Sequence, residues 1–287
     1  MALNLEIVGK PIETEPFRYG PDQTMLYALG IGAGPKELDF IYEKNLKVYP
    51  TFAVVPFLAG IFGPFMNKLN VNLAGVLHGE QKIILQRPIP PSGTLQSTLW
   101  CESVYDKGDK GAVINLRMET RNAEGDLLFE NLGKVFDRTA GNFGGERGPE
   151  SEIHEPPARL PPDFSVTYVT SFNQAAIYRL SGDKNPLHID PAFARRLGFD
   201  RPILHGLCTF GFAARAVLEA LCENDPDRLR SISGRFLNPV FPGDTLLTEA
   251  WEMDDGGYVL RTSNQEGKPV LGNAVAEIKP PVNMEAT

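Results

Sequence analysis

The chain has 287 residues, of which 42% are hydrophobic and 22% are charged. This composition is typical of a globular protein with one large or two ordinary domains. The formal net charge of −8 disfavours a nucleic-acid-binding protein, so we expect no nucleic-acid partner.

The two ends of the chain and its apolar stretches bear on its location. Residues 1–7 carry no basic stretch before an apolar run, and the last residues are not an S-K-L peroxisomal signal. The uncharged segment 48–67 is interrupted by prolines and glycines, which favours a buried core element over a membrane span. We therefore expect a cytoplasmic protein with no membrane partner. Cys101, Cys208 and Cys222 lack metal-like spacing and are expected to be buried free thiols.

The first half begins its core with the apolar segment 52–66. β-rich runs follow from about residue 78 to residue 137, with D-K-G-D-K-G and N-A-E-G as turns. The glycine- and proline-rich segment 141–162 has the composition of a linker.

The second half opens with a candidate capping box, Ser171 and Gln174, ahead of a short helix that carries Ile177 and Leu180. Asp190 and Pro191 form a good N-cap and first position for a helix over 191–197, which Gly198 would end. Apolar residues three and four apart predict a long helix over 207–222 that is buried nearly all round. Residues from about 229 to 279 then predict four strands in an antiparallel meander.

The two halves match each other in order. At an offset of 151, Tyr27, Gly60 and Trp100 fall on Tyr178, Gly211 and Trp251, and further matches lie between them. A run of ordered matches indicates an internal duplication.

A long buried helix wrapped by an antiparallel sheet is the hot dog architecture. The prediction is therefore an α+β protein with two tandem hot dog folds that pair as a pseudo-dimer. The expected domains are an N-terminal fold at 1–140, a linker at 141–162 and a C-terminal fold at 163–287.

The segment 181–190, S-G-D-K-N-P-L-H-I-D, carries the candidate chemistry. It places a carboxylate (Asp183), an amide (Asn185) and an imidazole (His188) within six positions. Pro186 removes a backbone donor and keeps Asn185 out of helical geometry, so this is a shaped loop. Such a loop can aim three polar groups at one water, which suits adding water to a double bond or removing it. Which of Asp183 and His188 is the base stays open.

Gly206 precedes the long predicted helix, in I-L-H-G-L. A helix N-terminus offers unpaired N–H groups and a partial positive charge, and a glycine lets a ligand approach the backbone. The Gly206 N–H can therefore stabilise an oxyanion, for example on a thioester carbonyl.

The motifs Y-R-L-S-G-D-K-N-P-L-H-I-D-P (178–191) and I-L-H-G-L (203–207) closely resemble those of the MaoC-like, type-2 enoyl-CoA hydratases. Matches in the first half, such as L-H-G-E-Q (77–81) and F-G-G-E-R (143–147), extend the resemblance to the double hot dog form. Members of this family convert trans-2-enoyl-CoA to (3R)-hydroxyacyl-CoA. The resemblance implies an acyl-CoA substrate, no dissociable cofactor, no metal, and a homodimer.

The resemblance also implies roles for single residues. Asp183 and His188 would be the catalytic acid–base pair, Asn185 would position water or substrate, and the Gly206 N–H would be the oxyanion donor. The residues expected to contact the substrate are His78, Gly79, Lys107, Lys184, Pro186, Leu187 and Phe236. Gly32 and Glu37 lie where Asp183 and His188 would project, so the first half would be non-catalytic and would bind the acyl chain.

Several alternatives remain at this point. The same chemistry run backwards is a (3R)-hydroxyacyl-thioester dehydratase. A hot dog thioesterase and an acyl-CoA-binding protein are the remaining functional alternatives. A zinc site from His188, Asp190 and His205 is the metal alternative, although Asp190 is better explained as a helix cap. His205 itself is expected to be structural or to support the catalytic residues, and His154 to be an exposed linker residue.

Overall fold

The computed structural model describes residues 3–61, 65–72, 75–254 and 256–280. The strands are β1 (Ile12–Glu13), β2 (Phe17–Tyr19), β3 (Val76–Leu85), β4 (Gly93–Asp106), β5 (Ala112–Arg121), β6 (Leu127–Asp137), β7 (Phe164–Val169), β8 (Leu229–Phe236), β9 (Thr245–Glu252), β10 (Gly257–Asn264) and β11 (Pro269–Ile278). The helices are α1 (Pro21–Gly30), α2 (Leu38–Ile41), α3 (Val54–Gly60), α4 (Met66–Leu69), α5 (Gln174–Tyr178), α6 (Pro191–Arg196) and α7 (Gly206–Leu221). Short 3₁₀ turns are η1 (Leu5–Ile7), η2 (Pro50–Ala53), η5 (Gly108–Lys110), η6 (Arg179–Ser181), η7 (Pro186–His188) and η8 (Pro226–Arg228).

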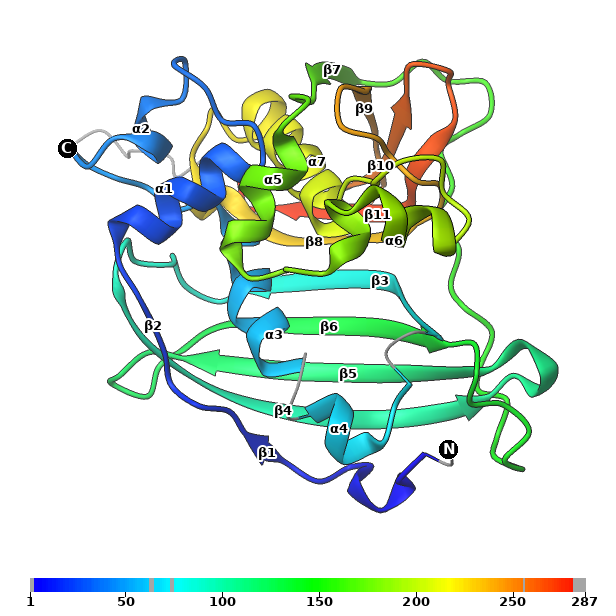
Figure 1. Cartoon of the computed structure of the whole chain (residues 1–287). Coiled ribbons are helices and arrows are strands. Elements are labelled where there is room, and N and C mark those ends of the chain that lie inside the picture. The colour runs from blue at the N-terminus through cyan, green and yellow to red at the C-terminus, as the bar shows by residue number, and fades with distance from the viewer. Residues whose placement is uncertain (1–2, 62–64, 73–74, 255, 281–287) are drawn as a thin grey trace.

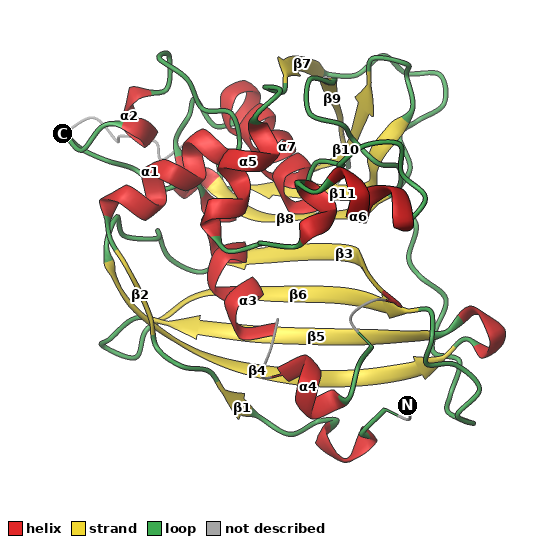
Figure 2. Cartoon of the chain, in the orientation of Figure 1, coloured by secondary structure: helices red, strands yellow, loops and turns green. Residues whose placement is uncertain are grey.

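All these strands belong to one 11-stranded sheet. Its order is β1-β4-β5-β6-β3-β8-β11-β10-β9-β7, with β2 beside β4 (Figures 1 and 2). The two halves meet where β3 pairs antiparallel with β8, with Glu80 opposite Arg235. In the predicted pseudo-dimer the two halves therefore share a single continuous sheet. They are joined at its centre by the pairing of one strand from each half.

The order of strands repeats between the halves, which confirms the double hot dog fold. β4, β5, β6 and β3 of the first half correspond to β9, β10, β11 and β8 of the second. Trp100 on β4 and Trp251 on β9 occupy corresponding places. The guanidinium of Arg117 lies 5.3 Å from the Trp100 ring, and that of Arg261 lies 5.1 Å from the Trp251 ring.

The central helix of the second half is α7. It begins at Gly206 and ends at Leu221, one residue earlier at each end than predicted, and every residue from Leu207 to Leu218 is buried. In the first half η2 and α3 take this place: they are buried through Leu58, and α3 ends at Gly60. Residues 62–64 of the predicted segment 52–66 lie outside the described residues.

The predicted strands are confirmed in both halves, and the short helix 191–197 is found as α6. The capping box at Ser171 is wrong in part. The Ser171 N–H does donate to Gln174 Oε1 (3.2 Å), but the Ser171 hydroxyl bonds Asn173, which is the N-cap of α5. Gln174 Nε2 instead donates to the carbonyls of Leu29 and Gly30, across the boundary between the halves.

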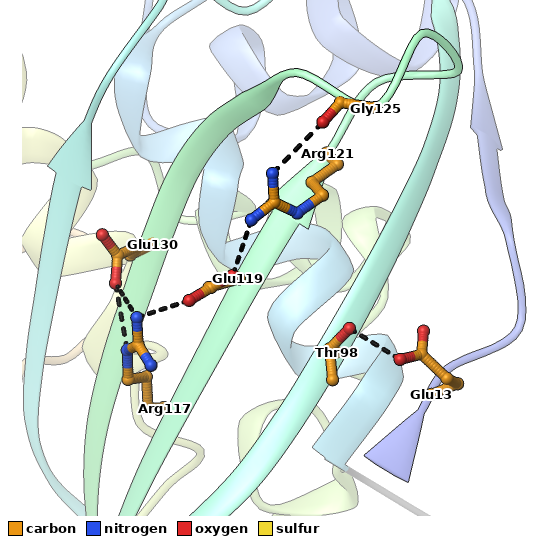
Figure 3. A network of polar contacts seen from close by, with 7 residues as sticks. All are labelled: Glu13, Thr98, Arg117, Glu119, Arg121, Gly125 and Glu130. Carbon is orange, nitrogen blue, oxygen red and sulfur yellow. Dashed lines mark hydrogen bonds and ion pairs between the residues drawn. The ribbon is translucent and has the colours of Figure 1, made fainter. Parts of the chain in front are cut away.

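A polar network covers part of the β4–β5–β6 surface (Figure 3). Arg117 bonds Glu130 and Glu119, and Arg121 bonds Glu119 and the Gly125 carbonyl. These side chains are partly exposed, so each pair contributes at most about 1 kcal/mol to stability. The network ties β5 to β6 and is a feature of the sheet surface.

The three cysteines are buried free thiols, as expected. Within the described parts of the chain, none of the helices is both long and apolar enough to span a bilayer.

Candidate active site

The loop between α5 and α6 is shaped by its own side chains. The Asn185 N–H donates to Asp183 Oδ1 (3.1 Å), and Asn185 Oδ1 accepts from the Leu187 N–H (3.0 Å). Pro186 starts the turn η7, which ends at His188. The predicted non-helical loop is present, and the Asn185 N–H and Oδ1 help to hold its shape.

His188 is buried, with 8% of its surface exposed. Its Nδ1 lies 2.9 Å from the Ile203 carbonyl oxygen. Because a carbonyl can only accept, Nδ1 carries the hydrogen, and Nε2 is left as a proton acceptor. Burial lowers the pKa of His188, and the nearby Asp183 carboxylate partly opposes that shift. The ring is therefore neutral at pH 7.

His205 lies directly against His188. The two rings stack with centroids 3.7 Å apart and planes 28° apart. His205 Nε2 lies 3.1 Å from the Asp183 carbonyl oxygen, whereas its buried Nδ1 has no partner among the described residues. Burial and the neighbouring His188 hold the pKa of His205 well below its ordinary value.

Asp183, His188 and His205 are also the group best placed to bind a metal. One ligand atom from each lies within 4.8 Å of the other two. His188 Nδ1 and His205 Nε2 each face a backbone carbonyl, so His188 Nε2 and His205 Nδ1 are the nitrogens that keep a lone pair. Asp190, the carboxylate in the alternative zinc set, caps α6 by accepting from Ala192 N (2.7 Å) and Phe193 N (3.2 Å). The group with metal-ligand spacing therefore contains Asp183 in place of Asp190.

Gly206 is the first residue of α7, and its N–H has no acceptor within the helix. An added Cβ would lie 3.1 Å from the Phe236 ring, so the ring packs closely against the Gly206 backbone. The His78 ring packs edge-on against Phe236, with centroids 5.3 Å apart. Pairing of β3 with β8 thus brings His78, Phe236 and Gly206 to one place.

His78 is held by the strand that carries it. Its Nε2 lies 3.1 Å from the Glu80 carbonyl oxygen, and burial lowers its pKa to about 4. The charge of Asp183 influences this pKa, which places His78 within electrostatic reach of the loop. Gly79 is the next residue of β3. An added Cβ at Gly79 would lie 3.2 Å from the carbonyl oxygen of Lys134.

The remaining predicted contact residues lie on the outside. Lys184 and Pro186 are exposed and Leu187 is half-buried. Lys107 precedes the β4–β5 turn, where its ammonium bonds the Arg147 carbonyl and lies 5.7 Å from the Tyr105 ring centre. The structure thus brings His78 and Phe236 to Gly206. Lys107 has its partners, Arg147 and Tyr105, at the C-terminal end of β4.

A largely apolar cavity of about 240 Å³ opens beside His188. The rest of its lining comes from Phe172, Ala175, Ala176, Ile189, Arg201, Pro202 and Pro242. The cavity gives a ligand an approach to the catalytic loop.

The first copy carries other residues, Gly32 and Glu37, at the two positions that correspond to Asp183 and His188. Glu37, which corresponds to His188, accepts two hydrogen bonds from the buried guanidinium of Arg215, at 2.9 and 2.7 Å. At Gly32, which corresponds to Asp183, an added Cβ would meet the Phe212 ring at 2.5 Å. Arg215 and Phe212 both come from α7. Side chains of the second copy therefore occupy the space beside Gly32 and Glu37 in the first.

Sequence reasoning did not find this ion pair or the contacts of His205. The available signal was a charge, Arg215, within a helix predicted to be buried, because a buried charge requires a partner.

The comparisons with known proteins agree with the duplication. The model of the MaoC like domain matches residues 154–272, and that of the MFE-2 hydratase 2 N-terminal domain matches residues 17–139. A probable enoyl-CoA hydratase 2 of Dictyostelium discoideum is 39% identical, with 94% of each chain covered. The 3-hydroxyacyl-thioester dehydratase Y of Mycobacterium tuberculosis is 40% identical over 96% of this chain and 99% of that protein.

Longer proteins also match. The peroxisomal multifunctional enzyme type 2 of Mus musculus is 40% identical over 95% of this chain, which spans only 38% of that enzyme's length. Among solved structures, a MaoC-like dehydratase of Phytophthora capsici superposes with a TM-score of 0.86 at 32% identity, covering 96% of this chain and 99% of that one.

Proposed function

The chain belongs to the MaoC-like family, in its double hot dog, hydratase 2 form, and we propose that it catalyses the reversible hydration of trans-2-enoyl-CoA to (3R)-3-hydroxyacyl-CoA. It is a hydro-lyase. The observation that supports the proposal is the grouping of Asp183, His188 and His205, with His205 directly before Gly206 at the start of α7.

The tautomer of His188 assigns the first step. Its Nε2 accepts, because Nδ1–H is engaged by the Ile203 carbonyl. Nε2 and the Asp183 carboxylate bind the two O–H groups of one water and direct its oxygen at the β-carbon of the enoyl thioester.

Water addition then transfers one proton through the pair. His188 Nε2 takes a proton from water as the C–O bond forms at the β-carbon, and the negative charge moves to the thioester oxygen. The Gly206 N–H and the N-terminus of α7 stabilise that oxygen. The imidazolium, held by the Asp183 carboxylate, returns the proton to the α-carbon, so the enzyme ends as it began.

The substrate lies between the two halves in this proposal. His78 and Phe236 contact the thioester near Gly206, and Gly79 leaves room beside them. Lys107, Lys184, Pro186 and Leu187 contact the CoA portion from the outside, and the first half accommodates the acyl chain. Asn185 acts by fixing the loop, since its Oδ1 is bonded to the Leu187 N–H.

The reverse reaction is the second candidate. A relative of nearly equal length is named a dehydratase, and microscopic reversibility gives both directions the same residues. The residues alone do not favour either direction, since the concentrations of the two thioesters decide it. We also propose that two chains form a homodimer, that no dissociable cofactor takes part, and that the enzyme is cytoplasmic, although a relative is named peroxisomal.

The test uses purified protein with crotonyl-CoA and trans-2-decenoyl-CoA. Loss of the enoyl-thioester absorbance, followed by oxidation of the product by an R-specific hydroxyacyl-CoA dehydrogenase alone, is the expected result. Oxidation by the S-specific enzyme, or release of free CoA without hydration, would contradict the proposal.

A further inference from the structure

We propose that His205 is a positioning residue: it fixes the Asp183 loop onto the start of α7, so that the acid–base pair and the oxyanion donor keep one spacing. This inference rests on the proposed function and deepens it. His205 adjoins Gly206 in sequence and is almost fully buried, with 1% of its surface exposed.

Two hydrogen bonds run in opposite directions between the same two segments. His188 of the loop donates from Nδ1 to the carbonyl of Ile203, two residues before His205. His205 in turn donates from Nε2 to the carbonyl of Asp183, five residues before His188. Each ring thereby binds the backbone of the segment that carries the other ring.

Ring contacts lock this reciprocal arrangement. His205 is stacked on His188 at 3.7 Å, and the Tyr178 ring packs near it, 4.9 Å away. Tyr178 belongs to α5, directly before the catalytic loop. His205 therefore contacts both ends of the segment that positions Asp183.

The protonation of His205 follows from its partners. Nε2 must carry the hydrogen because it faces a carbonyl, so the buried Nδ1 is an acceptor without a partner among the described residues. A neutral His205 gives a fixed hydrogen bond to the Asp183 carbonyl without placing a positive charge beside His188.

Two substitutions separate the donor from the ring. In His205→Gln the side-chain amide reaches about as far as Nε2 and can still donate to the Asp183 carbonyl. His205→Phe keeps an aromatic ring against His188 but has no donor. His154→Gln, in the linker, is the control; His154 is half-buried and not exposed as predicted, with its Nε2 3.7 Å from Glu152, and it lies outside the proposed site.

Activity is measured on trans-2-decenoyl-CoA. We expect His205→Phe to lower kcat by about 10–10²-fold, the scale of a misplaced catalytic group, with KM changed less than threefold. His205→Gln is expected to recover most of kcat, and His154→Gln to match the unmodified enzyme. Full kcat in His205→Phe would overturn the proposal. Equal losses of kcat in His205→Gln and His205→Phe, in proportion to their losses of Tm, would also overturn it.

A second measurement does not depend on activity. The chain has 4 histidines, so long-range ¹H–¹⁵N spectra assigned with single variants can report each tautomer. We expect an Nε2–H tautomer for His205 and an Nδ1–H tautomer for His188 at pH 7. The same tautomer in both rings would contradict the reciprocal bonds. If the unmodified protein does not hydrate either substrate, the proposed function fails, whereas these spectra still decide the role of His205 in the fold.

Discussion

Glu37 of the first half and Arg215 of the second form a buried, two-point ion pair. The side chains are 14% and 4% exposed, and the guanidinium also donates to the Ile31 carbonyl at 2.9 Å. Burial disfavours ionisation of Glu37, but hydrogen bonds from Arg215 and Tyr49 hold its pKa below the ordinary value. The position that corresponds to His188 is thus a link between the two copies.

Replacing Glu37 should therefore cost stability. Glu37→Gln leaves Arg215 buried without a counter-charge, and breaking such a pair costs about 3–5 kcal/mol of unfolding free energy. Asp39→Asn is the matched control, because Asp39 pairs with Lys47 on the surface, where such pairs contribute at most about 1 kcal/mol. Urea unfolding of both variants measures the difference, and equal losses would show that the buried pair has no special role.

Replacing Gly32 of the first copy by alanine should destabilise the protein. Gly32 has a φ of +82°, and a Cβ there would meet Phe212. Gly9 has a φ of +77° but nothing within 4 Å of an added Cβ. Both Gly→Ala variants carry a left-handed backbone penalty of about 1–2 kcal/mol. Gly32→Ala should lose about 1–3 kcal/mol more from overpacking. Equal Tm values would contradict the contact with Phe212.

Gly206→Ala should impair catalysis without unfolding the enzyme. The added methyl group would push against Phe236 and the bound thioester, and a small displacement of reacting groups can cost about 10²-fold in rate. We expect kcat/KM to fall by about 10–10²-fold. Gly34→Ala is the control, since an added Cβ there has open space. A Gly206→Ala enzyme with unchanged kcat/KM would remove the α7 N-terminus from the site.

Stability should fall as the solution is acidified. Burial lowers the pKa of His78 from 6.5 to about 4, and that of His188 and His205 in the same direction. Between pH 6.5 and about 4 the unfolded chain therefore binds more protons at His78 than the folded one. The unfolding free energy must decrease with falling pH in this window.

Urea unfolding at pH 7 and pH 5 measures this effect. His78→Asn should show a smaller decrease than the unmodified enzyme, and His154→Asn the same decrease. The acid limb of kcat/KM should likewise have its midpoint below 6.5, because the pKa of His188 is lowered. A midpoint above 6.5 would contradict a neutral, buried His188.

The fold followed from local signals that survive in a single sequence. Trp100 and Trp251, the turns, and the three- and four-residue spacing of 207–222 sufficed for two hot dog folds. Asp183 and His188 are five positions apart in one loop, so their proximity was foreseeable.

Pairings between the halves were not foreseeable. Glu37 and Arg215 are 178 positions apart, and only the β3–β8 junction decides which buried charges meet. The tautomer of His205 depends on the direction of the Asp183 carbonyl. Residue types alone do not determine the direction of a backbone carbonyl.

The most direct test of the account compares one carboxylate from each half: Asp183 in the loop of the second half, and Glu37, which falls at the position of His188 in the first. We would measure kcat on trans-2-decenoyl-CoA for Asp183→Asn and Glu37→Gln at a temperature where both are folded. We expect Asp183→Asn to lose about 10²–10⁴-fold, as for loss of the carboxylate that orients the water and stabilises the imidazolium, and Glu37→Gln to stay within a few-fold of the unmodified enzyme. Near-normal turnover in Asp183→Asn, or a comparable loss in folded Glu37→Gln, would contradict a single active site in the second half.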